Sequence, residues 1–214
     1  MDQLKTPLMK RRIVMALAGM LLAGVSVGLF KRAFFGVDPF QCLCAGLNNL
    51  IPIHFGTLYM IINAVMLIAV FFLDRHYIGI STFINLFLLG YVAEFTEGLL
   101  AKIFGMPTLP GQIAFLLAGI VLSCIAAALY YTADLGVSAY DAIPLHIADK
   151  RPRLFGKAVP FRAVRICTDL ICTLLGFLMG CVPGVGTVIT ALFMGPLITF
   201  FRKTVSDPLL KKAI

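Results

Sequence analysis

Leu17-Ala18-Gly19-Met20-Leu21-Leu22 is repeated 100 residues later as Leu117-Ala118-Gly119-Ile120-Val121-Leu122. The match needs no gap as far as Leu47, and it pairs Gly36 with Gly136. A second block, at an offset of 105 residues, pairs Gly79, Thr82 and Gly90 with Gly184, Thr187 and Gly195. The sequence therefore predicts one domain, residues 1–214, built from two related halves at about 12–104 and 112–204.

The composition indicates a protein of the lipid bilayer. Apolar residues make up 60% of the chain and charged residues 13%, against about 45–50% and about 25% in soluble domains. Six apolar stretches have lengths near that of a membrane-crossing helix: 13–30, 56–73, 78–95, 113–131, 166–181 and 185–201. None of them alternates apolar and polar residues as a barrel strand does.

An odd number of spans in each half gives the two halves opposite orientations in the bilayer. We therefore predict an all-α integral membrane protein. It has six transmembrane helices and two short broken or re-entrant helices, arranged as two inverted repeats of three spans. The lipid bilayer is the expected partner, and a homodimer is left open.

The basic residues predict the orientation of the chain. With the N-terminus in the cytoplasm and six spans, only Lys31, Arg32 and Lys102 lie outside, and the other fifteen of the eighteen lie inside. Such a bias is typical of cytoplasmic loops. We expect a multi-pass protein of the cell (inner) membrane with both termini in the cytoplasm. Because the basic residues sit at helix ends rather than on one soluble face, we expect no nucleic-acid binding.

Each half is interrupted after its first span, at residues 33–56 and 133–160. The interruptions are rich in glycine, proline and polar residues, so we expect a loop followed by a short helix in each. Asp38 precedes Pro39, as an N-cap does, and Ser138 occupies the equivalent place. Gly36 and Gly136 stand where the long helix must break, which predicts φ > 0 at both.

Interrupted segments at matching positions in two halves are typical of a transport site. The first N–H groups of a buried helix are unpaired and carry a partial positive charge, so they can hold a polar or anionic group. Gln41 and Asp141 share one repeat position in the short helices, and with Asp38 they are candidate binding residues. The alternative is that both helices lie flat in the membrane interface, one on each side.

The sequence Ala133-Asp134-Leu135-Gly136-Val137-Ser138-Ala139-Tyr140-Asp141 and its counterpart in half one resemble the signature of YitT/YczE-type bacterial membrane proteins. Gly184-Val185-Gly186-Thr187, followed by Gly195-Pro196, is similar to the last span of that family. The resemblance covers nearly the whole chain, and we expect the short form without a soluble C-terminal domain. It implies a fold rather than an activity. Half one carries Gln41 where half two carries Asp141, so an acidic role is not implied twice.

An ionisable group inside a membrane is a functional candidate because it is costly there. Asp169 lies within an apolar stretch and, with one residue of slack, matches Asn63 in half one. In inverted halves these two side chains approach each other near the midplane, as a binding pair. The alternative is a structural ion pair between Asp169 and Arg165 or Arg162.

Two further carboxylates are candidates for binding a proton or a cation. Asp141 either takes that role or caps its own loop. Glu94 lies one turn from Glu97 on the third span, and only Glu94 is deep enough to be a serious candidate.

The sequence predicts a secondary transporter of an unidentified small polar solute, with coupling to protons through Asp169, Asp141 or Glu94 as an option. The alternatives are a membrane scaffold without transport and a membrane subunit of a larger complex. We expect no enzymatic activity, because no catalytic motif is present. We expect no cofactor and no metal, because the six cysteines and three histidines show no metal-ligand spacing.

Overall fold

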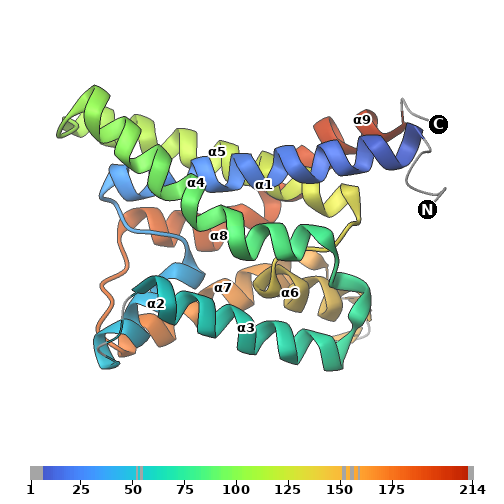
Figure 1. Cartoon of the computed structure of the whole chain (residues 1–214). Coiled ribbons are helices and arrows are strands. Elements are labelled where there is room, and N and C mark those ends of the chain that lie inside the picture. The colour runs from blue at the N-terminus through green and yellow to red at the C-terminus, as the bar shows by residue number, and fades with distance from the viewer. Residues whose placement is uncertain are drawn as a thin grey trace.

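The computed structural model describes residues 7–51, 53, 55–150, 153–154, 157–158 and 160–211 (Figure 1). Half one contains α1 (Pro7–Ala33), α2 (Pro39–Leu50), α3 (Phe55–Leu73), the short turn η2 (Arg75–Tyr77) and α4 (Ile80–Phe104). Half two contains α5 (Leu109–Ala133), α6 (Ala139–Asp149), β1 (Arg153–Leu154), β2 (Lys157–Ala158), α7 (Phe161–Leu178) and α8 (Val185–Phe201). The chain continues through η3 (Arg202–Ser206) into α9 (Asp207–Lys211).

The two halves have the same order of elements: a long helix, a short helix and two further helices. The expectation of a helical protein is confirmed, and the small antiparallel hairpin of β1 and β2 is an addition to it. The repeat extends to backbone angles, because φ is +98° at Gly36 and +97° at Gly136. The prediction of φ > 0 at both glycines is confirmed. The non-glycine residues Phe34 and Asp134, which share a repeat position, also have similar positive φ angles of +57° and +54°.

The long helices α1 and α5 lie against each other and run in opposite directions (Figure 1). Gly19 of α1 lies close to Tyr130 near the end of α5, whereas Gly119 of α5 lies close to Phe30 near the end of α1. Both glycines permit this close approach, because an added Cβ would come within 3.0 Å of the other helix in each case. The first repeat therefore forms the main packing interface between the halves.

The loop after each long helix binds the start of the last helix of the other half. The Ser81 N–H donates to the carbonyl of Leu135 at 3.0 Å, and the Gly186 N–H donates to the carbonyl of Phe35 at 2.8 Å. Ser81 and Gly186 are repeat partners, as are Phe35 and Leu135. These reciprocal bonds satisfy N–H groups at helix starts that would otherwise lack a partner.

The same exchange involves side chains. The Thr82 hydroxyl donates to the carbonyl of Val137 at 2.7 Å, and the Thr187 hydroxyl donates to the carbonyl of Val37 at 2.6 Å. A Cβ on Gly136 would lie 2.4 Å from the Gly79 nitrogen, so the loop fits only as glycine. Each half therefore supplies carbonyl acceptors for the hydrogen bonds at the start of the other half's last helix.

Among the described residues, four helical segments are long and apolar enough to cross a membrane: Leu8–Ala33, Ile80–Phe104, Leu109–Ala133 and Val185–Leu210. Thr57–Leu73, in α3, is apolar but shorter. In α7, Arg162, Arg165 and Asp169 interrupt the apolar sequence. Six spans therefore stay a prediction.

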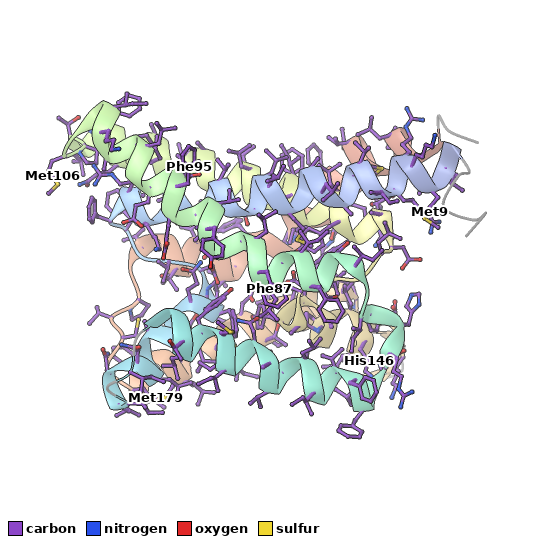
Figure 2. The ribbon with its side chains drawn as sticks, viewed as in Figure 1. Met9, Phe87, Phe95, Met106, His146 and Met179 are labelled. Atoms are coloured by element: carbon purple, nitrogen blue, oxygen red, sulfur yellow. The ribbon has the colours of Figure 1, made fainter. Side chains whose placement is uncertain are left out.

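Apolar side chains cover much of the outside of the molecule. Phe95 is 71% exposed and Met106 is 82% exposed. Figure 2 shows both on the outside of the molecule, Phe95 on α4 and Met106 just after its C-terminal end. In contrast, Asp169 is fully buried and Arg165 is 5% exposed. An apolar exterior around a charged interior is the reverse of the pattern in soluble proteins and suits a lipid environment.

Candidate functional site

The two short helices begin with capped N-termini, as the sequence predicts. The Asp38 carboxylate accepts from the N–H groups of Phe40 and Gln41, both at 3.1 Å. The Ser138 hydroxyl accepts from the N–H of Asp141 at 3.0 Å. The rings of Phe40 and Tyr140 stack with centroids 4.9 Å apart, so the two helix starts meet at the centre of the molecule.

A central cavity of about 90 Å³ lies at this meeting point. Its lining follows the internal repeat, because sixteen of its nineteen residues form eight pairs related by an offset of 100, 105 or 106 residues. The pairs are Ala23 and Ser123, Val27 and Ala127, Phe30 and Tyr130, Asp38 and Ser138, Phe40 and Tyr140, Gln41 and Asp141, Tyr59 and Arg165, and Leu89 and Met194. Ser26, Asn63 and Asn85 complete the lining. Equivalent faces of the two halves therefore enclose one space.

A buried network of charges forms the half-two side of this cavity. Arg165 on α7 forms ion pairs with Asp141 on α6 and with Asp169 one turn further along α7. The Arg165 Nε to Asp169 Oδ2 distance is 3.1 Å. A guanidinium that is shared between two carboxylates has its charge fully compensated, which is what makes such burial tolerable.

Three tyrosines complete the hydrogen bonds of this network. The Tyr130 hydroxyl donates to Asp141, and the Tyr140 hydroxyl donates to Asp169. Arg165 Nη1 donates to the Tyr131 hydroxyl at 3.5 Å, and its guanidinium carbon lies 4.8 Å from the centre of the Tyr140 ring. The network is therefore held by α5, α6 and α7 together.

Asp169 has the geometry of the ion-pair alternative that the sequence leaves open. It contacts Arg165 and Tyr140, which line the cavity, while Asp169 itself lies behind them. Asp141 does line the cavity, and its carboxylate binds Arg165 instead of capping its loop. Any role of these two carboxylates in ligand binding stays a prediction.

The half-one side of the cavity is polar but carries a single charge. Gln41 Nε2 donates to Asp38 Oδ2 at 2.6 Å, and Asn63 Nδ2 donates to the carbonyl of Tyr59 at 2.9 Å. Asp38, Gln41 and Asn63 all line the cavity, as the sequence predicts for a shared site. At the repeat positions of Arg165, Asp169 and Asp141, half one carries Tyr59, Asn63 and Gln41.

A second, larger cavity of about 450 Å³ opens beside the first and contains Glu94. It lies among α1, α2, α3 and α4, and it shares Val27, Gln41, Tyr59 and Leu89 with the central cavity. Figure 2 shows Phe87, another lining residue, on the side of α4 that faces α3. Glu94 therefore lines the second cavity and not the central one.

Sequence reasoning found only part of the role of Arg165. Its spacing of four residues from Asp169 predicts the ion pair, because i,i+4 partners share a helix face. The orientation analysis also counts Arg165 among the cytoplasmic basic residues, whereas the structure buries it in the cavity wall, and its pairing with Asp141 was not predicted. The tyrosines gave no such signal.

In the part of the chain that the structure describes, no three His, Cys, Asp or Glu residues are grouped closely enough to hold a metal ion. A family model described as a family of unknown function (DUF6198) matches residues 10–203. An uncharacterized protein of Haemophilus influenzae is 29% identical over 198 residues, which cover 92% of this chain and 85% of that protein. No solved structure matches the chain.

Proposed function

Because this chain belongs to the DUF6198 family of unknown function, we propose its function from the geometry of its site: secondary transport of a small polar solute. The observation that carries this proposal is the central cavity, whose walls are repeat-equivalent residues of the two halves. A site on the symmetry axis between repeats is typical of transporters that alternate access between the two sides of a membrane.

The polar lining supports transport over a scaffold role. Asp38, Gln41 and Asp141 come from the starts of the short helices, and Asn63 and Arg165 come from the third helix of each half. A scaffold has no need of polar groups around an internal space, where each one is costly unless it is paired. A transported solute can bind these groups where they face the cavity.

The proposed membrane arrangement has six spans in two inverted halves. The opposite directions of α1 and α5 and the reciprocal loop contacts support the inversion. The basic residues support cytoplasmic termini in a bacterial inner membrane. Reporter fusions after Gly105 and after Lys211 test this arrangement. A reporter fused after Gly105 should lie outside the cytoplasm, and one fused after Lys211 should lie in the cytoplasm. The opposite pattern contradicts it.

We also propose kinship with the YitT/YczE-type proteins. The motif from Ala133 to Asp141 supports it, because here these residues form the loop with Gly136 at φ +97° and the start of α6. A YitT/YczE-type structure without equivalent contacts between its glycine loops and its last helices would argue against this kinship.

An uptake assay tests the proposed function. The purified protein is reconstituted into liposomes and offered radiolabelled amines, amino acids, carboxylates, sugars and urea, with empty liposomes as the control. We expect saturable uptake of one chemical class. Uptake is repeated with a pH gradient, because stimulation by the gradient distinguishes coupling to protons from facilitated diffusion. If no class enters faster than into empty liposomes, the chain is a scaffold or a subunit instead.

A further inference from the structure

The charges around the central cavity are unbalanced. Among the described residues, Arg165 is the only cation in the lining, and it is already paired with Asp141 and Asp169. Asp38 faces the same space from half one, and none of the ion pairs of the described residues includes it. The lining therefore has two carboxylates, Asp38 and Asp141, and one guanidinium, which also binds Asp169 behind the lining.

The helix starts are capped by the chain's own side chains. Asp38 accepts from the N–H groups of Phe40 and Gln41 in α2, and Ser138 accepts from the N–H of Asp141 in α6. At the start of α2, a carboxylate of the chain therefore takes the position that a bound anion would take.

The Gln41 amide provides a second observation. The side chain is 6% exposed, lines both cavities and donates its N–H to Asp38. The amide of glutamine carries an acceptor oxygen as well as donor N–H groups. A ligand with N–H groups that enters the cavity therefore meets an acceptor at this position.

Aromatic rings surround the same space. Phe40 contacts both Tyr59 and Tyr140 there, with ring centroids 5.6 Å and 4.9 Å away. The faces of such rings attract cations, and the attraction is strongest where water is excluded. Rings favour an organic cation over a metal ion, which requires several oxygen ligands.

The second cavity carries a further carboxylate. Glu94 and Lys31 both line it, and Lys31 is paired with Glu97 at 3.1 Å, whereas none of the ion pairs of the described residues includes Glu94. A negative group beside the central cavity raises the local concentration of a cation.

We infer that the solute is a small organic cation with N–H donors, a primary ammonium or a guanidinium group. Its charge binds Asp38, an N–H donates to the Gln41 amide oxygen, and the rings around Tyr140 contact its apolar part. This inference rests on the proposed transport function and names the substrate class of the same cavity.

The test uses the full-length protein in detergent and measures its melting temperature with matched small probes. Guanidinium and ethylammonium are compared with their neutral counterparts urea and acetamide, and with acetate as the anion, at equal ionic strength and low millimolar concentration. A ligand that binds only the folded state raises the melting temperature. We expect guanidinium or ethylammonium to raise it and the other three to leave it unchanged.

Substitutions locate the binding. Asp38→Asn keeps the helix cap, because asparagine caps as well as aspartate does, and it should weaken cation binding by about thirtyfold or more. Glu94→Gln should weaken it by only about two- to fivefold. Asp207→Asn is the control and should bind normally, because Asp207 pairs with Arg202 and both lie outside the two cavities.

The outcomes separate this inference from the proposed function. Stabilisation by acetate or urea overturns the cation and leaves transport standing. Cation binding that survives Asp38→Asn overturns the assigned site. If no probe stabilises the protein, the inferred solute class is wrong, and the uptake assay then decides separately whether the protein transports another class. Cation binding without uptake contradicts the transport function and keeps the site.

Discussion

Two equivalent pairs of helices pack differently in the two halves. α3 and α4 leave a space between them in half one, whereas α7 and α8 are in close contact in half two. In half two, Gly195 of α8 lies against α7, because a Cβ added to it would be 3.2 Å from the carbonyl oxygen of Arg162. Its repeat partner Gly90 of α4 has no atom of another segment within 4 Å of that position. The 450 Å³ cavity lies there instead, between α4 and α3.

The two halves also differ in the charges that hold their third helices. Arg165, Asp141 and Asp169 bind α7 to α6 in half two, whereas the equivalent residues Tyr59, Gln41 and Asn63 are uncharged. A repeated backbone thus supports both a closed and an open packing of one helix pair. The open pair leads from the surface toward the central site, and the closed pair blocks the equivalent path. In the proposed transport cycle, α3 closes on α4 while α7 separates from α8.

Removal of Arg165 should destabilise the protein most. Arg165→Met leaves two buried carboxylates without a cation, which costs about 3–5 kcal/mol. The matched control is Arg162→Met, because Arg162 is exposed one turn earlier on α7 and should have little effect. Thermal unfolding in detergent measures both variants. Equal melting temperatures would mean that the charge network does not hold the closed half together.

The two glycine loops should be equally sensitive, because here the halves are alike. Gly36→Ala and Gly136→Ala each force a Cβ into a backbone with positive φ, which costs about 1–2 kcal/mol before any clash is counted. Gly98→Ala on α4 has open space around it and serves as the control. Melting temperatures that fall for one loop and not the other would contradict the reciprocal packing of the halves.

Leucine at position 90 should have the smallest effect on stability and a large effect on transport. The structure has room for Gly90→Leu, so the melting temperature should stay within the range of the control variant Gly98→Leu. The new side chain fills the space into which α3 must close, so uptake into liposomes should be lost while cation binding persists. Normal uptake by Gly90→Leu would show that α3 and α4 need not meet.

The fold was largely readable from the sequence because its strongest signals are local. Apolar length predicts helices, and Asp38-Pro39 and Gly36 fix where the first long helix ends and the short one begins. The repeat offset then predicts that half two does the same. These features depend on backbone geometry and on neighbours in the chain, which a single sequence contains.

The site was readable only in part, because its partners come from distant segments. Asp38, Gln41, Asn63 and Asp141 were predicted and do line one cavity. Arg165 was counted among the cytoplasmic basic residues and was also an alternative partner of Asp169. Its second partner, Asp141, comes from another helix and could not be predicted from spacing along α7. The openness of half one has no counterpart in the sequence, because it depends on how two helices pack and not on which residues they contain.

The reciprocal loops also fix the order in which this protein can be completed during synthesis. When the ribosome has made residue 104, the Ser81 N–H and the Thr82 hydroxyl still lack the carbonyls of Leu135 and Val137 that satisfy them. The start of α4 is therefore completed only when the second half has been made. Because Thr187 and Gly186 take their acceptors from the first half in return, neither half holds all of its own hydrogen-bond partners.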